Sequence, residues 1–282
     1  MSHEISEDGN PAVQRQLDAS RTQLARYATD LKTLLRREAA KTRQITRVNK
    51  QLKAYARDLK KSYDAEQRKN HELEQAYAET IVRLSLASRY KDEETGGHIE
   101  RLSHYSKTMA LCIGWSDEAA QQLFAAAPMH DVGKIGIPDA VLGKQGPLEE
   151  EEWDMIKTHP TLGASLLAGS SSPLLKMARE VAITHHERWD GSGYPYGLKG
   201  EQIPLTGRIV MLGDQYDALR SKRPYKPSFS HKKACDLILH GNERTKPAHF
   251  DPQLLSAFRE IHHEFDGIYS RVIEETSGLI PS

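Results

Sequence analysis

Cysteine is scarce in this chain of 282 residues. The two cysteines, Cys112 and Cys235, lie far apart and form no CxxC pair, so the sequence suggests neither a disulfide framework nor a thiolate zinc site. Such sparse use of cysteine favours a cytoplasmic location. The sequence has no N-terminal basic segment followed by an apolar run, and no hydrophobic stretch long enough to span a bilayer. We therefore predict a cytoplasmic protein without a membrane span.

The chain also has no excess of either charge. Its 39 lysines and arginines balance 39 acidic residues, which disfavours a protein that is basic overall and binds nucleic acid polymers. A basic stretch does occur from Lys32 to Lys61, where only Glu38 and Asp58 are acidic. A basic helix can contact an anionic surface. No aromatic side chains are interleaved to stack on bases, so we interpret this stretch as the solvated face of a coiled coil.

Proline and glycine are absent from about residue 12 to residue 80, where good helix formers dominate. Apolar residues recur there every seven positions, with a second row three positions further on. The first row is Leu17, Leu24, Leu31, Ile45, Leu52, Leu59 and Leu73, and the second is Tyr27, Leu34, Val48, Tyr55 and Ala76. One long helix with a narrow apolar stripe cannot bury that stripe alone, so we expect a parallel homodimer. A helical hairpin is the alternative, although no turn signal marks its bend.

The remainder of the chain has apolar residues at spacings of three and four and no sustained alternation, which favours an all-α domain. We place the N-terminal coiled-coil helix at residues 1–83 and the second domain at residues 84–282. Glycine and proline cluster at residues 133–147 and 190–204. We expect these stretches to be long loops beside histidines, where a rigid scaffold usually carries a functional site.

Histidines and carboxylates stand at the expected helix ends. Glu94 and His98 are four residues apart, so on a helix they share a face and can share a metal ion. Adjacent helical residues diverge by about 100°, so His185 and His186 suit two neighbouring ions. The carboxylate of Asp131 has two oxygens and can bridge two metals. Ligands of nitrogen and oxygen without sulfur indicate iron or manganese, with zinc also possible. The pattern predicts a centre with several metal ions.

These residues fall in motifs that resemble a known family. "HDVGK" at residues 130–134 is similar to the signature of the HD superfamily of metal-dependent phosphohydrolases, and "HHERWDGSGYP" at 185–195 is similar to that of its HD-GYP subfamily. Further matches are "ETGGHIER", "GKIGIPD", "EEEEWDMIKTHP" and "GRIVMLGDQYDALRSKRPYK". The resemblance covers roughly residues 84–230. It implies an HD-GYP helical bundle and a bacterial phosphodiesterase that hydrolyses cyclic di-GMP to linear pGpG and, in many members, to GMP.

The resemblance also implies a role for each matching residue. The metal ligands would be Glu94, His98, His130, Asp131, His159, His185, His186 and Asp214. The substrate's phosphates would be held by Lys134, Tyr194, Arg223 and Lys226. His130, Asp131 and Lys134 would carry the catalysis, and Asp217 falls in the family's "YDAL" segment. Members with a carboxylate at the place of Glu94 resemble a three-metal class, so we expect two or three divalent ions, most simply iron or manganese.

Three functions remain open at this stage. The first is cyclic di-GMP hydrolysis, the second is a cyclic di-GMP-responsive scaffold with weak or no catalysis, and the third is hydrolysis of another nucleotide. The GYP loop of the family is also a docking surface for signalling partner proteins, so its presence does not separate catalysis from interaction. A second histidine pair, in "HHEFDG" at residues 262–267, lacks the GYP turn, and we expect His262 and His263 to be ordinary helix residues. Four histidines match no motif and are left unassigned: His104, His231, His240 and His249.

Overall fold

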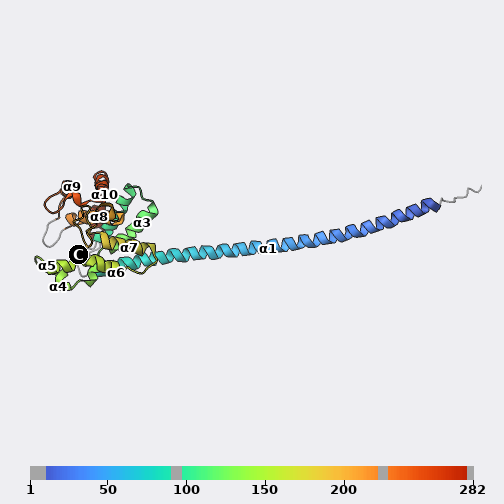
Figure 1. Cartoon of the computed structure of the whole chain (residues 1–282), viewed down its shortest axis with the longest axis horizontal. Coiled ribbons are helices and arrows are strands. Elements are labelled where there is room, and N and C mark those ends of the chain that lie inside the picture. The colour runs from blue at the N-terminus through green and yellow to red at the C-terminus, as the bar shows by residue number, and fades with distance from the viewer. Residues whose placement is uncertain (1–10, 90–96, 222–227, 278–282) are drawn as a thin grey trace, which may run out of the picture. The chain divides into compact units, whose positions relative to one another are not determined.

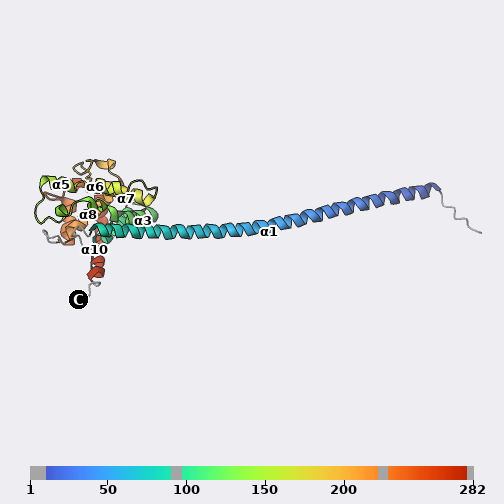
Figure 2. The same ribbon diagram turned by 90° about the horizontal axis from the view of Figure 1, so that it is seen from below.

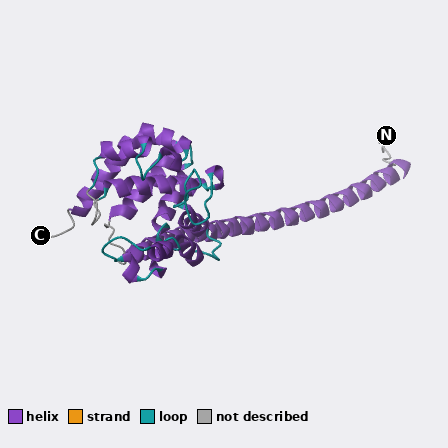
Figure 3. Cartoon of the chain, turned by 60° about the vertical axis from the view of Figure 1, so that its left-hand side comes forward, coloured by secondary structure: helices purple, strands orange, loops and turns teal. Residues whose placement is uncertain are grey.

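The computed structural model describes residues 11–89, 97–221 and 228–277. Every regular element in these ranges is helical, and no strand occurs among them (Figure 3). The predicted all-α fold class is therefore confirmed. By its internal contacts the chain divides into two units, Met1–Leu73 and Glu74–Ser282. The domain boundary predicted after residue 83 lies within the first helix and stays a prediction.

The first helix, α1 (Pro11–Arg89), is continuous (Figure 1). The prediction of one long helix is confirmed, and the hairpin alternative is wrong because α1 contains no turn. Its predicted apolar stripe is exposed, from 45% at Val48 to 73% at Leu59. A helix gains stability in water mainly when such a stripe packs against a partner. No helix in the described part of the chain is long and apolar enough to cross a membrane.

The second unit is built around α2 (Gly97–Cys112), which packs against three helices. These are α3 (Asp117–Ala126), α8 (Leu205–Arg220) and α10 (Pro252–Ser277). Figure 2 shows the C-terminal turns of α10 extending beyond the other helices of this unit. The shared core contains fully buried aromatic rings, and Tyr105 of α2 stacks on Phe265 of α10 with 4.5 Å between ring centroids. This core holds α2 and α8 side by side, and both carry residues of the predicted site.

The remaining elements are shorter. They are η1 (Ala127–Met129), η2 (Val132–Gly136), α4 (Asp139–Leu142), α5 (Glu150–Ile156), α6 (His159–Leu166), α7 (Pro173–Thr184), η3 (Gly200–Gln202), α9 (His231–His240) and η4 (Pro247–His249). The stretch 133–147 was expected to be a long loop, but it contains most of η2 and the whole of α4. The expectation was wrong there because Pro138, at the N-cap of α4, is a residue that starts a helix as readily as it ends one. The stretch 190–204 is irregular apart from η3, as predicted.

A second, smaller apolar cluster joins α3, η1, η2, α6 and α7. Its members are Ala126, Met129, Val132, Leu167, Ala178 and Ala182. Met129 and Val132 stand immediately before and after the His130–Asp131 pair and are both buried. The pair is therefore anchored on both sides by apolar packing, which fixes where its polar side chains point.

Candidate metal centre

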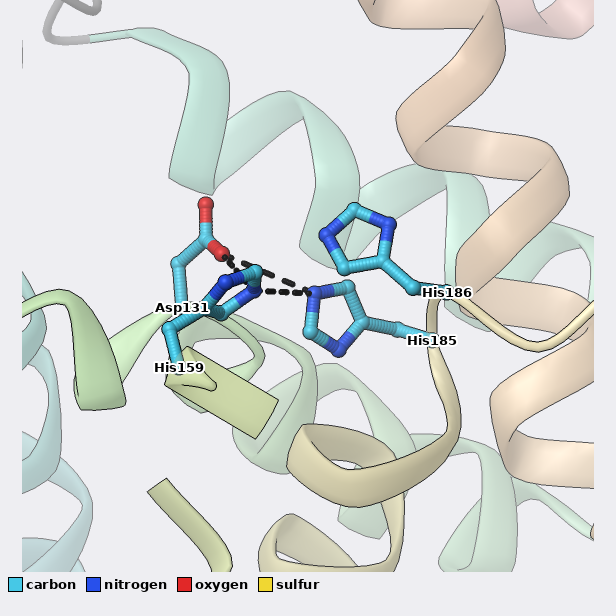
Figure 4. A group of neighbouring side chains, drawn as sticks. All are labelled: Asp131, His159, His185 and His186. Atoms are coloured by element: carbon cyan, nitrogen blue, oxygen red, sulfur yellow. Dashed lines mark hydrogen bonds and ion pairs between the residues drawn. The ribbon is translucent and has the colours of Figure 1, made fainter. Parts of the chain in front are cut away.

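The carboxylate of Asp131 lies between two groups of nitrogen atoms. Its Oδ1 is 3.1 Å from Nε2 of His159 and 3.5 Å from Nε2 of His185, as the dashed lines of Figure 4 show. Its Oδ2 is 3.2 Å from Nε2 of His130 and 2.7 Å from Nζ of Lys134. One carboxylate thus faces imidazoles with both oxygens. This is the arrangement expected of a ligand shared by two metal ions.

The histidines around this carboxylate are oriented by hydrogen bonds on their far side. Nδ1 of His98 lies 2.8 Å from Oδ2 of Asp217. The Nδ1 atoms of the other three histidines lie near backbone carbonyl oxygens: His130 is 3.0 Å from Ala127, His159 is 2.7 Å from Ile156, and His185 is 3.0 Å from Ala182. An oxygen acceptor at Nδ1 places the proton of a neutral imidazole there, which leaves Nε2 as an electron-pair donor. Outer hydrogen bonds of this kind orient metal-binding histidines. All four Nε2 atoms can therefore bind metal.

Two of these donors face each other. Nε2 of His159 and Nε2 of His185 are 3.3 Å apart, and both carry lone pairs when Nδ1 is protonated. Burial lowers the pKa of His185, and burial together with His185 and His159 lowers the pKa of His186 well below its usual value. Protonation is thus disfavoured at neutral pH. A divalent cation satisfies these converging lone pairs, so the donor set fits a metal.

Asp131 is ionised in this setting. Burial by itself would raise its pKa, but the positive charge of the neighbouring Lys134 ammonium opposes burial and holds the pKa well below the usual value. The carboxylate therefore brings a full negative charge to the centre of the cluster. Neutral imidazoles and an ionised carboxylate are the protonation states that a divalent ion requires of its ligands.

A second group of potential ligands adjoins the first. His98, His130 and Asp214 offer donor atoms that all lie within 4.8 Å of one another. His98 Nε2 is 3.6 Å from Asp214 Oδ1, and the rings of His98 and His130 are 5.5 Å apart between centroids. Asp131, His159, His185 and His186 form the other group under the same criterion. The two groups meet at His130 and Asp131, which are neighbours in sequence.

Two residues behind His98 were not given a role from the sequence. Asp217 accepts hydrogen bonds from Nε of Arg101 at 2.6 Å and from Nη2 of Arg101 at 2.8 Å, while its Oδ2 lies 2.8 Å from Nδ1 of His98. Arg101 and Asp217 are both almost fully buried. Asp217 lies three residues after Asp214, so both project from one face of α8. His98 and Arg101 have the same spacing of three on α2. These two spacings are the sequence signals that could have identified the hydrogen bonds among His98, Arg101 and Asp217.

Close backbone packing brings His159 to Asp131. A Cβ at Gly133 would lie 1.9 Å from the carbonyl oxygen of His159 and 2.4 Å from the backbone nitrogen of Gly163. Only glycine permits this approach between η2 and α6. His159 is the first helical residue of α6 and is followed by Pro160, which favours the start of a helix. The glycine in "HDVGK" therefore has a geometric role in the centre.

The loop after the histidine pair is bent back on itself. A Cβ at Gly193 would lie 2.3 Å from the backbone nitrogen of Arg188, so the bend requires glycine. The buried carboxylate of Glu187 accepts backbone N–H bonds from Tyr196 at 2.8 Å and from Leu198 at 2.9 Å. Sequence reasoning assigned nothing to Glu187, because a carboxylate that orders a loop has no distinctive spacing.

Tyr194 borders the metal ligands. Its ring stacks on that of His186 with 4.6 Å between centroids. Burial, followed by the charge of Asp131, raises the pKa of Tyr194 above its usual value. The phenol therefore keeps its proton and can donate a hydrogen bond at the edge of the centre.

The structure brings together nine of the residues predicted to form the site. They are His98, His130, Asp131, Lys134, His159, His185, His186, Tyr194 and Asp214. Glu94, Arg223 and Lys226 lie outside the described residues. His185 and His186 were expected to suit two neighbouring ions because neighbours on a helix diverge, and the structure places both in one group of possible ligands with Asp131 and His159. His185 is the C-cap of α7, so the helix ends there and the divergence does not apply.

The chain is similar to proteins that are named as cyclic dinucleotide phosphodiesterases. A cyclic di-GMP phosphodiesterase of Vibrio cholerae is 45% identical over 202 residues, covering 67% of this chain and 40% of that protein. A cyclic di-GMP phosphodiesterase of Thermotoga maritima is 40% identical over 204 residues, covering 72% of this chain and 54% of that protein. A 3′3′-cGAMP-specific phosphodiesterase of Vibrio cholerae is 36% identical over 197 residues, covering 70% of this chain and 37% of that protein. The chain spans about half or less of the length of these relatives.

A family model described as the HD domain matches residues 81–254. The matched range contains the histidine pair of the GYP motif, the His130–Asp131 pair and Asp214, the residues that the structure gathers around one centre. This range is more than half of the chain. The chain therefore belongs to the HD domain family.

Proposed function

We propose that this chain is a metal-dependent phosphodiesterase that hydrolyses cyclic di-GMP to linear pGpG and onward to GMP. The observation that carries the proposal is the convergence of buried imidazole nitrogens on the carboxylate of Asp131. Nitrogen and oxygen ligands without sulfur suit iron or manganese. Both of the relatives cited above at 40% identity or more are named as cyclic di-GMP phosphodiesterases. Their shared name favours cyclic di-GMP over other nucleotides.

The ligands of two ions would be divided between the two groups of donors. Asp131, His159, His185 and His186 would hold one ion, and His98, His130 and Asp214 the other. Asp131 would contribute an oxygen to each. Divalent cations, when bound, acidify water into a nucleophile at neutral pH and offset negative charge on a phosphodiester. Glu94 would supply a further ligand for a third ion.

Charged and hydroxyl groups of the chain would hold the substrate. Lys134, whose Nζ is 2.7 Å from Oδ2 of Asp131, places a positive charge beside the scissile phosphate. The phenol of Tyr194 donates to a phosphate oxygen at the edge of the centre. Arg223 and Lys226 bind the second phosphate, for which the planar fork of arginine and the point charge of lysine are suited. The proposed hydrolysis requires no side chain as nucleophile, because water attacks the phosphate.

Three further parts of the proposal concern the setting of the enzyme. The exposed stripe of α1 would pair with that of a second copy in a parallel homodimer, with residues 1–83 acting as the dimerisation and signalling helix. The ordered GYP loop would dock signalling partner proteins. The enzyme would work in the cytoplasm, as the sparse use of cysteine suggests.

Turnover of a defined substrate tests the proposal directly. Purified full-length chain, loaded with Fe²⁺ or Mn²⁺ without air, should convert cyclic di-GMP to pGpG, as followed by chromatography. His130→Ala should form no product. A parallel panel with 3′3′-cGAMP separates cyclic di-GMP specificity from a broader activity, because one relative carries that name. If metal-loaded protein binds cyclic di-GMP without forming pGpG, the chain is a scaffold and not an enzyme. If another nucleotide is turned over faster, that nucleotide is the substrate instead of cyclic di-GMP.

A further inference from the structure

A third cluster of metal-binding side chains lies outside the centre described above. His231 and Cys235 are four residues apart on α9, and His262 comes from α10. These residues offer donor atoms that all lie within 4.8 Å of one another. The proposed phosphodiesterase mechanism uses none of them. We infer that His231, Cys235 and His262 form a zinc site that joins α9 to α10.

The distances between the donor atoms support this inference. Cys235 Sγ is 3.7 Å from His231 Nε2, and a tetrahedral zinc ion with the usual bond lengths separates sulfur from nitrogen by about 3.6 Å. His231 Nε2 is 2.9 Å from His262 Nδ1, whereas two nitrogens on one zinc ion are about 3.3 Å apart. The sulfur is therefore at ligand spacing from Nε2, but it lies equally close to Nδ1 of the same ring, at 3.6 Å. The His231 ring has to turn so that Nε2 faces an ion shared with the sulfur. The two imidazoles need to move apart by only a few tenths of an ångström.

The far side of His231 has the partner that a metal ligand needs. Its Nδ1 lies 2.8 Å from the hydroxyl oxygen of Tyr216. With zinc bound, Nδ1–H donates to that hydroxyl and Nε2 is left for the ion. The same hydroxyl accepts a hydrogen bond from Arg220 at 3.0 Å, and Arg220 is paired with Asp266. The positive charge of Arg220 is therefore compensated and does not repel a cation.

The burial of the ligands also suits a metal site. Cys235 is 7% exposed and belongs to the main core, while the side chain of His231 is 21% exposed. One side of the cluster is thus open for the ion to enter and for a water molecule as fourth ligand. Zinc would bind Cys235 as the thiolate, and the thiol proton would be released to solvent.

Because it contains a sulfur ligand, this site prefers a different metal from the phosphodiesterase centre. Thiolate and imidazole select zinc, whereas imidazole with carboxylate accepts iron and manganese. No CxxC pattern marks the site, because its ligands come from segments about thirty residues apart in sequence. The inference does not depend on the proposed function and stands if the chain hydrolyses no cyclic dinucleotide.

Cobalt spectroscopy distinguishes the two kinds of site. Full-length chain that has been freed of metal with a chelator is titrated with Co²⁺, and thiolate-to-cobalt charge-transfer absorption is recorded in the near ultraviolet. The ligands around Asp131 contain no sulfur and give no such band. We expect a band whose intensity at excess Co²⁺ corresponds to one cobalt–thiolate site per chain and that added Zn²⁺ abolishes. Cys235→Ser should lose the band, and Cys112→Ser, which changes the exposed cysteine, should keep it.

Zinc content gives a second measurement. His262→Gln should bind about one zinc ion fewer per chain than the wild type, whereas His263→Gln, at the exposed neighbouring position, should bind the same number. Near-ultraviolet circular dichroism checks that each variant is folded. The inference is overturned if folded wild type shows no thiolate band at excess Co²⁺, if Zn²⁺ leaves the band unchanged, or if Cys235→Ser retains it.

Discussion

Leucines in the two units of this chain have opposite environments. Leu59 in α1 is 73% exposed, whereas Leu102 in α2 is completely buried. The second unit has a buried apolar core of its own, to which Leu102 belongs. Helix α1 carries a regular apolar stripe that nothing within Met1–Leu73 covers. From this difference we propose that the second unit carries the chemistry and that α1 mediates association, and the following changes test that division.

The largest effect is expected from Asp131→Ala in the second unit. Loss of the carboxylate that faces both ligand groups should remove metal and lower turnover by about a thousandfold or more, since bound metal supplies several kcal/mol of transition-state stabilisation. Metal analysis and turnover of cyclic di-GMP measure this. Asp154→Ala, at a position 65% exposed, is the control. Equal metal content in wild type and Asp131→Ala would contradict the role of Asp131 as a metal ligand. A change in the sedimentation of Asp131→Ala would show that the metal centre and association are not separate.

The next largest effect is expected from Leu52→Lys in α1. Each copy would lose about 1.5 kcal/mol of apolar burial, so the dissociation constant of a dimer should rise by roughly a hundredfold. Analytical ultracentrifugation measures the change. Thr46→Lys, on the outer side of the same helix, should leave association unaltered. If Leu52→Lys and wild type sediment alike at all concentrations, the stripe does not mediate dimerisation.

Asp217→Asn should lower the free energy of unfolding by about 3 kcal/mol, because it leaves Arg101 buried without its anionic partner. Urea denaturation of the second unit's tertiary signal measures this loss. Asp154→Asn should change stability by less than about 0.5 kcal/mol. A loss as small as that of the control would mean that the buried pair contributes nothing.

The same variant makes a pH prediction. Burial opposes ionisation of Asp217, but hydrogen bonds from Arg101 and His98 outweigh it and hold the folded-state pKa below the unfolded value of about 3.9. The stabilisation is therefore fully present above about pH 4 and is lost as the pH falls through the folded-state pKa. Wild type should lose stability on acidification below pH 4 more steeply than Asp217→Asn does. Parallel curves would show that this carboxylate is not the titrating group.

A smaller effect is expected from Arg223→Ala. Loss of a charged hydrogen bond of about 1.5–3 kcal/mol should raise the KM for cyclic di-GMP by roughly 10- to 100-fold. Metal content should not change, because arginine binds no metal. Arg259→Ala, on the exposed side of α10, serves as the matched change of charge. Loss of metal in Arg223→Ala would place this residue in the metal centre instead of the substrate site.

The smallest change is expected from Glu94→Ala. With three ions bound, metal content should fall by about one ion per chain, and the ions held through Asp131 should remain. Elemental analysis of protein purified without air measures this, with Glu118→Ala in α3 as the control. An unchanged metal content would restrict the centre to two ions.

Much of the fold could be predicted from the sequence because its signals are local. The lack of proline and glycine before residue 80 and the seven-residue repeat indicated the helix that is now α1. Spacings of three and four indicated an all-α second domain, and α2, α3, α7 and α8 are among its helices. The elements between residues 132 and 142 were missed, because short helical turns such as η2 and α4 depend on the packing of Val132 and Val141 into the core and not on periodicity.

The metal centre was predictable to the extent that its ligands stand in ordered motifs. The motifs brought out His130, Asp131 and the histidine pair, and the structure places these residues together. Sequence could not show the hydrogen bonds that orient the rings of His130, His159 and His185, because these bonds come from backbone carbonyls. Sequence also could not show the relation between His231 and His262. One lies at the start of α9 and the other within α10, and only packing makes them neighbours.

The contact at Gly133 gives the centre a very narrow steric tolerance. A Cβ atom at this position would lie 1.9 Å from the carbonyl oxygen of His159, so only the hydrogen atom of glycine fits there. A single methyl group there would push α6 away and would withdraw an imidazole from the cluster without altering any ligand. The spacing between the ions that the enzyme is proposed to hold thus depends on a residue that binds none of them.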